Sequence, residues 1–150
     1  MSIQITQHFS LDELTTTDRV KFKDKNYQYG LSKITQMNIL AHFAEQVRLV
    51  VGCPMKITSG IRCEELNAVV GGSKTSQHLK GEAIDFIPTK IKIKTAFDKI
   101  KKSNLEFGQL IIENDGKSEW LHISIGHKKQ ILRAIKLSHQ LDSMYFQMFK

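Results

Sequence analysis

The sequence has few of the residues that mark specialised classes of protein. Its 150 residues include only 2 cysteines, 2 prolines and 9 glycines, and aromatic residues make up 8%. With 41% hydrophobic residues, this composition excludes a fibrous or disordered chain. No stretch approaches the roughly 18 uncharged apolar residues of a membrane span, because charged residues interrupt even the most apolar segment, 34–51. We therefore expect one globular domain over residues 1–150, a size typical of single domains.

The two cysteines, Cys53 and Cys63, are too few for a disulfide framework and do not form a CxxC pair. We expect two free thiols, as in a reducing compartment, and the sequence leaves a single bridge between them open. The N-terminus has neither a basic start nor an apolar run, so we expect no secretory signal.

Basic residues outnumber acidic ones, 22 to 15, which gives a net charge of +7 and a pI of about 9.4. This surplus is typical either of a solvated basic surface or of a protein that binds a polyanion such as nucleic acid, anionic lipid or a cell-wall polymer. The sequence lacks the interleaved aromatic and basic residues of nucleic-acid binders. The segment 71–75 also departs from a phosphate-binding loop, because Ser73 rather than glycine precedes Lys74. We expect no specific nucleic-acid partner.

Hydrophobic spacing and turn residues predict an α+β fold, with helices first and antiparallel strands later. Ser10 and Glu13 have the spacing of a capping box that opens a short helix, and Ser32 is expected to cap a longer one. Residues 15–30 are polar and are expected to be mostly loop. The other predicted helices are 34–51, 64–70 and 92–102, and the predicted strands are 55–58, 82–87, 109–112, 120–125 and 130–137. Residues 138–150 form a tail of uncertain role, with the spacing of a terminal helix.

One polar segment carries most of the chemical information. In Ser76-Gln-His78-Leu-Lys-Gly81-Glu-Ala83-Ile-Asp85, a loop histidine precedes a strand aspartate by seven residues. An aspartate among apolar residues is expected to be partly buried, and a buried carboxylate must be neutralised, hydrogen-bonded or bound to a metal. His122 follows in Glu119-Trp-Leu-His122-Ile-Ser124. Two imidazoles and one carboxylate suit a catalytic zinc ion, although each residue alone is also explained by a surface, core or ion-paired position.

Together these motifs resemble the zinc-site pattern of the M15 peptidase family. The matching residues are Ser76-x-His78-x-x-Gly81-x-Ala83-x-Asp85, Glu119-x-x-His122 and the block Ser59-Gly-Ile-Arg62. The family includes D-alanyl-D-alanine carboxypeptidases and the L-alanyl-D-glutamate endopeptidases of bacteriophage endolysins, and it shares its fold with the Hedgehog signalling domain. The resemblance implies a single α+β domain whose central antiparallel sheet carries the zinc site, with helices packed on one side.

The resemblance also implies a role for each matching residue. The ligands of one zinc ion per chain would be His78, Asp85 and His122. Glu119 would be the general base, and Arg62 would bind the substrate carbonyl and stabilise the oxyanion. Contacts with the substrate or the ligand loop would come from Ser76, Trp120 and Ser124.

The position of Glu119 conflicts with regular strand geometry. Glu119 lies three residues before His122, and alternation along a strand places such residues on opposite faces. To reach the metal, Glu119 must precede the regular strand or lie beside a bulge. If Glu119 points away, Glu113 or Asp115 is the next candidate for the base.

The resemblance implies a zinc peptidase, expected to be monomeric, that cuts peptidoglycan stem peptides. We favour an L-alanyl-D-glutamate endopeptidase of the endolysin type over a D-alanyl-D-alanine carboxypeptidase, because carboxypeptidases are usually exported and often carry elements that grip a terminal carboxylate. The other alternative is a binding or assembly module that retains the metal site without hydrolysis. The +7 charge would hold the enzyme near an anionic cell wall. The absence of a signal fits storage in the host cytoplasm before release, or delivery with a virion.

Overall fold

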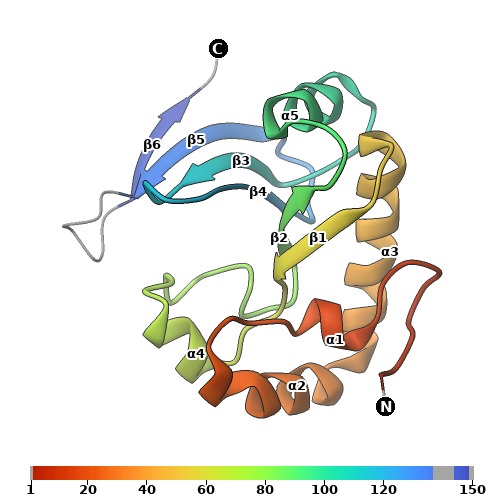
Figure 1. Ribbon diagram of the computed structural model, residues 1–150, viewed down its shortest axis with the longest axis vertical. Coiled ribbons are helices and arrows are strands. Elements are labelled where there is room, and N and C mark those ends of the chain that lie inside the picture. The colour runs from red at the N-terminus through yellow and green to blue at the C-terminus, as the bar shows by residue number, and fades with distance from the viewer. Residues whose placement is uncertain (1, 137–143, 149–150) are drawn as a thin grey trace. The chain divides into compact units, whose positions relative to one another are not determined.

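The computed structural model of the chain describes residues 2–136 and 144–148. The helices are α1 (Leu11–Leu14), α2 (Lys23–Ser32), α3 (Ile34–Val51), α4 (Glu64–Val69) and α5 (Ile93–Lys102), with a 3-10 turn, η1, at Val20–Phe22. The strands are β1 (Met55–Ser59), β2 (Ala83–Pro88), β3 (Gln109–Asn114), β4 (Glu119–Ser124), β5 (Gln130–Lys136) and β6 (Met144–Met148). The predicted α+β class is confirmed (Figure 1).

The chain divides into two compact units that alternate along the sequence. The first unit comprises Met1–Gln46 and Ile57–Ile84, and the second comprises Val47–Lys56 and Asp85–Lys150. The division passes through α3, β1 and β2, so these elements contribute residues to both units. That the whole chain is one domain stays a prediction.

A locally encoded cap begins the first helix of the first unit. Ser10 Oγ accepts a hydrogen bond from the Glu13 N–H at 3.3 Å, and Glu13 Oε2 accepts one from the Ser10 N–H at 2.9 Å. This is the predicted capping box, which satisfies two N–H groups that the helix itself cannot bond. Leu11 and Leu14 are fully buried, so the cap fixes a helix that contributes to the core.

The second helix, α2, corrects the prediction that residues 15–30 are mostly loop. Its buried residues are Asn26 and Gly30, so the helix lacks the apolar periodicity by which helices are recognised in a sequence. A Cβ on Gly30 would lie 2.3 Å from Thr15 Cγ2, and glycine therefore permits a close approach between α2 and the segment after α1. The helix is specified by packing rather than by its own pattern.

The long helix α3 matches its predicted bounds, and its buried face has helical spacing. Its fully buried residues include Met37, Leu40, Ala41, Ala44 and Val47. The helix ends before Gly52, which has a φ of 81°. The expected cap is wrong, because Ser32 is the last residue of α2 and its hydroxyl donates to the Tyr29 carbonyl at 2.6 Å.

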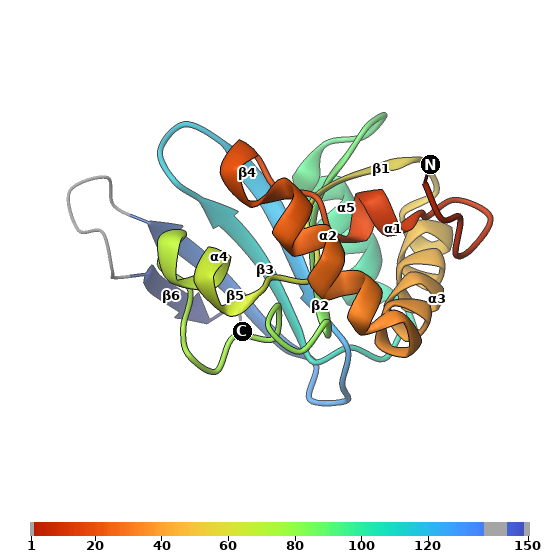
Figure 2. The same ribbon diagram turned by 90° about the horizontal axis from the view of Figure 1, so that it is seen from below.

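The sheet has six strands in the order β1-β2-β4-β3-β5-β6. β3 pairs with β4 in antiparallel orientation, and β5 pairs with β6 in the same way. β3 and β5 pair in parallel, so the sheet is mixed rather than purely antiparallel as expected. Strands β3, β4 and β5 lie side by side in both ribbon views (Figures 1 and 2).

The β3–β4 hairpin closes through hydrogen bonds that its turn residues make with the backbone. Asn114 Oδ1 accepts from the Gly116 N–H at 2.7 Å, and Asp115 Oδ1 accepts from the N–H groups of Lys117 and Ser118 at 2.9 and 2.7 Å. Gly116 has a φ of 87°, which glycine adopts at little cost. The bonds from Ser118 and Lys117 lower the pKa of Asp115 below its usual value, against a smaller raising effect of burial. The turn therefore fixes the register of β3 against β4.

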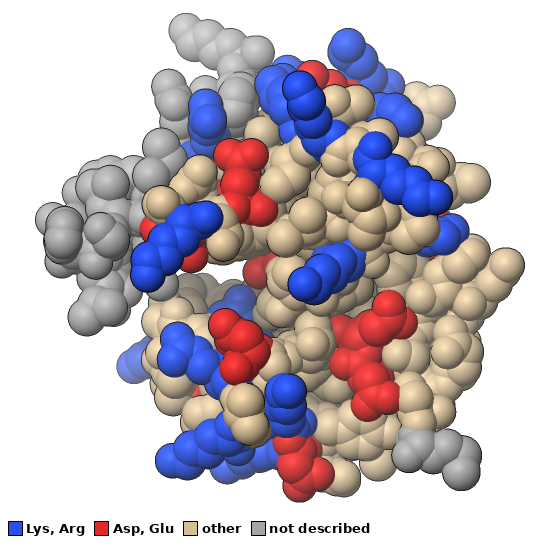
Figure 3. All heavy atoms as spheres, in the orientation of Figure 1, with Lys and Arg blue, Asp and Glu red and all other residues tan. Residues whose placement is uncertain are grey.

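Helix α5 packs on this hairpin through an apolar face. Ala96, Phe97 and Ile100 are fully buried, and the helix contacts β3 and β4. Its lysines lie on the exposed side. On the face in Figure 3, the described Lys and Arg side chains are scattered with acidic residues between them, as on a solvated basic surface.

Part of the predicted C-terminal helix is a strand. Met144–Met148 forms β6, so the helix prediction is wrong for these residues. The rest of the predicted helix lies outside the described residues. β6 pairs with β5, a long-range contact that local helical spacing cannot anticipate.

Two further expectations concern the cysteines and the membrane. Cys53 and Cys63 are both free and buried, so the expectation of free thiols is confirmed. None of the described helices combines the length and the apolar character needed to span a bilayer.

Candidate functional site

His78 lies in the loop between α4 and β2 and is almost fully buried, with 2% exposure. Its Nδ1 contacts the Gly60 carbonyl at 2.7 Å. A carbonyl only accepts, so Nδ1 carries a proton and donates this hydrogen bond. Histidines that ligate a metal commonly donate their other N–H to a carbonyl in this way. Gly60 is itself confined, because an added Cβ would lie 2.1 Å from the Leu14 carbonyl oxygen.

The loop that carries His78 is fixed by side chains from two helices. The Tyr29 hydroxyl of α2 donates to the Leu79 carbonyl at 3.1 Å, and Gln36 Nε2 of α3 donates to the Gly81 carbonyl at 3.0 Å. Gly81 has a φ of 67°, and a Cβ there would lie 2.7 Å from Met37 Cε. Glycine is therefore favoured here by the backbone conformation, and a larger residue would also have to displace the end of the Met37 side chain.

Ser76 contributes to the shape of the same loop. Its Oγ accepts from the His78 N–H at 3.3 Å, and its N–H donates to the Ser73 carbonyl at 2.9 Å. These contacts support the expectation that Ser76 shapes the ligand loop.

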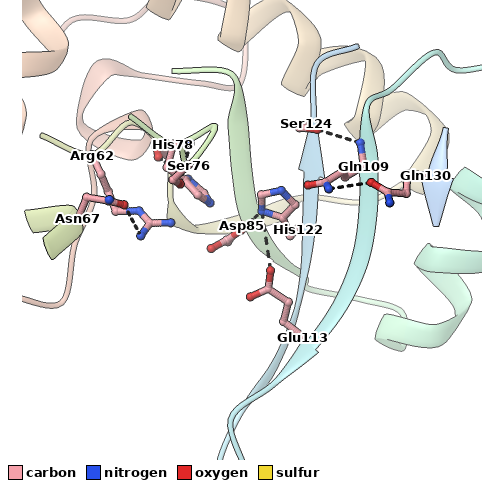
Figure 4. A network of polar contacts seen from close by, with 11 residues as sticks. Arg62, Asn67, Ser76, His78, Asp85, Gln109, Glu113, His122, Ser124 and Gln130 are labelled. Atoms are coloured by element: carbon pink, nitrogen blue, oxygen red, sulfur yellow. Dashed lines mark hydrogen bonds and ion pairs between the residues drawn. The ribbon is translucent and has the colours of Figure 1, made fainter. Parts of the chain in front are cut away.

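Arg62 follows β1, and the folded chain fixes its backbone closely. The Arg62 N–H donates to the His78 carbonyl at 2.9 Å, which ties the two motifs together. Asn26 brackets the residue, because its Nδ2 donates to the Ile61 carbonyl and its Oδ1 accepts from the Cys63 N–H, both at 2.9 Å. The guanidinium Nη1 donates to Asn67 Oδ1 at 3.2 Å (Figure 4).

In the second unit, three acidic or imidazole side chains lie together. Asp85 Oδ1 of β2 lies 2.9 Å from His122 Nδ1 of β4, and Glu113 Oε1 of β3 lies 3.9 Å from the same nitrogen (Figure 4). All three are buried. Burying carboxylates is costly unless they are hydrogen-bonded, paired or coordinated to a metal, and the contacts with His122 provide such pairing here.

The register of the hairpin determines which carboxylate shares a face with His122. Ile111 lies opposite His122, Glu113 opposite Trp120, and Asn114 opposite Glu119. Opposed residues share a face and alternate residues return to it, so Glu113 and His122 lie on one face. Glu119, the first residue of β4, is in regular pairing and falls on the other face. Of the two glutamates, Glu113 is therefore the one that shares a face with His122.

The other two expected substrate contacts differ from each other. Ser124 is fully buried, and its Oγ accepts from the Gln109 N–H at 2.8 Å, so it links β4 to β3 instead of lining a cleft. Trp120 lies on the face of Glu113, and its buried Nε1 has no hydrogen-bond partner among the described residues. A buried indole N–H usually has a partner, and a bound molecule would supply one.

His78, Asp85 and His122 form a buried group whose ligand atoms lie within 4.8 Å of one another. Their donors, two imidazole nitrogens and one carboxylate oxygen, fit a divalent transition metal and in particular a catalytic zinc, which commonly has three protein ligands. The tautomer set at His78 by Gly60 fits this use.

A buried His–Asp–His group that could hold a metal ion, with a further carboxylate beside it, is an arrangement typical of metal-dependent hydrolases. The comparison with protein families agrees, because the family model described as Peptidase M15 matches residues 7–124. The chain belongs to the M15 peptidase family, a family of hydrolases, and the resemblance noted in the sequence is confirmed. No curated protein matches the chain.

Sequence reasoning missed the residues that hold the site, namely Asn26, Gln36, Gly60 and Asn67. Their partners lie five to 45 residues away in the chain, and most of these contacts involve a backbone group on one side, which no sequence pattern reports. Asn67 is the one of these residues that the sequence could most easily have indicated, because it lies on a predicted short helix five residues after Arg62. Glu113 was identified, but only as a substitute for Glu119.

Proposed function

We propose that the protein is a zinc metallopeptidase that hydrolyses peptidoglycan stem peptides, with one zinc ion per chain. The observation that carries the proposal is the buried His78–Asp85–His122 group in a chain of the M15 family. These three residues would hold the ion, which when bound polarises the scissile carbonyl and makes water a better nucleophile near neutral pH.

Glu113 is the residue we assign as general base. Its carboxylate shares a face with His122 and lies 3.9 Å from that imidazole. A carboxylate so placed would accept a proton from the attacking water and deliver it to the leaving amine, which requires a group within hydrogen-bond reach of both. Glu119, which the family pattern suggests, is the alternative that the same experiments test.

Arg62 would bind the substrate carbonyl and stabilise the negative charge that develops on its oxygen. A guanidinium is always charged and offers several donors in a rigid plane, so it suits this role. Its fixed backbone, bonded to the His78 loop and bracketed by Asn26, supports a role that needs an accurate position.

Ser76 would support the ligand loop, and Trp120 would contact substrate through its indole N–H. Ser124 has no part in this proposal, because its hydroxyl is engaged with the backbone of Gln109.

The specific reaction we propose is cleavage between L-alanine and D-glutamate, as in endolysin-type wall lysis. The net charge of +7 would hold the enzyme near an anionic cell wall. An enzyme of this kind acts as a monomer at the wall after release from the host cytoplasm or delivery with a virion. No specific nucleic-acid partner is required.

Mass spectrometry of purified muropeptides after incubation with the zinc-loaded protein tests the proposal. We expect new peptides that begin with D-glutamate, loss of activity with EDTA, and recovery with added zinc. Release of free D-alanine would instead identify a carboxypeptidase. Intact muropeptides, or hydrolysis that survives complete metal removal, would contradict the proposed function.

A matched pair of histidine variants provides the control. His78→Ala should abolish both hydrolysis and zinc retention. His42→Ala changes an exposed histidine on α3 and should leave both unchanged. A His78→Ala protein that still hydrolyses muropeptides would exclude His78 as a ligand.

A further inference from the structure

Asn67 lies on α4 and is almost completely buried, with 4% exposure. Its side-chain Nδ2 donates to the Ser73 carbonyl at 3.0 Å. Because a carbonyl only accepts, this bond fixes which end of the amide is which, and Oδ1 is the end that accepts from Arg62 Nη1 at 3.2 Å. The amide is thus held at one end by the loop and holds the guanidinium at the other.

The backbone around this amide is fixed as well. The Asn67 N–H donates to the Cys63 carbonyl at 2.9 Å, and the Asn67 carbonyl accepts from the Gly72 N–H at 2.9 Å. Cys63 and Gly72, at the two ends of the segment that follows Arg62, are therefore both bonded to the main chain of Asn67. A residue bonded through its main chain and both ends of its side chain has little freedom to move.

Gly72 keeps space for the contact between Asn67 and Arg62. A Cβ at Gly72 would lie 2.1 Å from Asn67 Oδ1 and 2.9 Å from Arg62 Nη1. Gly72 does not have a positive φ, so the need for glycine comes from space and not from backbone conformation. Any larger residue must displace the Asn67 amide or the guanidinium.

We propose that Asn67 is a positioning residue of the peptidase site, which holds the Arg62 guanidinium in the orientation that receives the substrate carbonyl. This inference rests on the proposed role of Arg62. A neutral amide suits the task, because it orients the guanidinium without cancelling the positive charge that stabilises an oxyanion, as a carboxylate would.

A double-mutant cycle separates this role from simple support of the 71–73 loop. Asn67→Ala should lower kcat on muropeptides by about 10–100-fold with little change in KM, because the affected interaction strengthens in the transition state. In an Arg62→Ala background, Asn67→Ala should change kcat by less than about twofold, since the group that it positions is gone. Equal losses of kcat in both backgrounds would overturn the inference.

Two further variants protect the test against a general loss of folding. Gly72→Ala, which keeps every side chain of the contact, should lower kcat in the same way and also lose its effect in the Arg62→Ala background. Thr15→Val removes a buried hydrogen bond to the Leu11 carbonyl, 2.8 Å long, and should lower Tm while leaving kcat unchanged. A Gly72→Ala enzyme with the kcat of the unmodified protein would contradict the proposal.

Side-chain NMR tests the same inference without requiring activity. The Nε–H signal of Arg62, assigned by its loss in Arg62→Lys, should show an ordered guanidinium in the unmodified protein and an order parameter below about 0.6 in Asn67→Ala. Unchanged order in Asn67→Ala would overturn the inference. Wild-type turnover by Arg62→Ala would also overturn it but leave the hydrolase function standing, whereas absence of hydrolysis in the unmodified protein would contradict the proposed function itself.

Discussion

The two compact units hold their functional side chains in different ways. In the first unit, neutral groups hold them: a main-chain carbonyl accepts from His78, and an asparagine amide accepts from Arg62. In the second unit, Asp85, Glu113 and His122 lie against one another. The first arrangement depends on the accurate course of the backbone. The second depends on charge and is therefore the half expected to change most when a charge is removed.

The units also differ in total charge. The first unit holds eight basic and eight acidic residues, whereas the second holds fourteen basic and seven acidic ones. The whole surplus of +7 thus belongs to the second unit. Two of its acidic residues, Asp85 and Glu113, are buried and cannot offset the basic surface locally.

Removing the charge of Glu113 should have the largest effect. Glu113→Gln keeps the shape of the side chain but cannot accept a proton, so kcat should fall by about 10²–10⁴-fold. Zinc content should stay unchanged. Turnover of purified muropeptides and metal analysis of the same sample measure both quantities.

The matched variant for this comparison is Glu119→Gln. Glu119 lies on the opposite face of β4, so kcat should change by no more than about twofold, as for substitutions away from a site. The reverse order of effects, with Glu119→Gln inactive and Glu113→Gln active, would identify Glu119 as the base.

Removing the neutral hydrogen bonds that hold Arg62 in the first unit should mainly reduce the stability of the fold. Asn26→Ala removes two hydrogen bonds to carbonyls, those of Thr15 and Ile61, and one from the Cys63 N–H. Leaving such buried groups unpaired should lower the free energy of unfolding by about 2–4 kcal/mol. Urea denaturation measures this change, with Asn38→Ala on the exposed side of α3 as control. A loss below about 1 kcal/mol would show that water replaces these bonds.

The contact between His8 and Glu45 in the first unit should matter least. Burial raises the pKa of Glu45, but the hydrogen bonds from the His8 ring, at 2.8 Å, and the His8 N–H outweigh it, and the net pKa lies below its usual 4.5. Folded protein then binds fewer protons than unfolded protein, so the contribution is present above about pH 4.5 and is lost as pH falls through the folded-state pKa.

Glu45→Gln should therefore remove less than about 1 kcal/mol near neutral pH and flatten the decline of stability below it. Urea titrations at several pH values compare the two slopes. A steeper decline in Glu45→Gln than in the unmodified protein would contradict a lowered pKa for Glu45 in the folded state.

The sequence predicted the parts of this molecule whose cause is local. The capping box of Ser10 and Glu13, the apolar face of α3 and the β3–β4 turn all depend on residues within a few positions of one another. The grouping of His78, Asp85 and His122 was also accessible from the sequence, because a pattern of fixed spacing carries His78 and Asp85. Helix α2 was not, since its buried residues Asn26 and Gly30 give no apolar period.

The pairing of two strands determines which of Glu119 and Glu113 shares a face with His122. The motif places Glu119 near His122 in the sequence, while the register places Glu113 near it in space. The helix prediction for Met144–Met148 was wrong for a related reason, because the pairing of this strand with β5 is not apparent from its local spacing.

The contact between His78 and the Gly60 carbonyl has a consequence for how this enzyme can vary. No substitution can delete a main-chain oxygen. The orientation of the His78 imidazole therefore depends on the path of the backbone at Gly60, and replacing another side chain does not remove its hydrogen-bond acceptor. The position at which a substitution would disturb this contact is Gly60 itself, where even one methyl group would collide with Leu14. Directed evolution of this scaffold should therefore keep glycine at position 60.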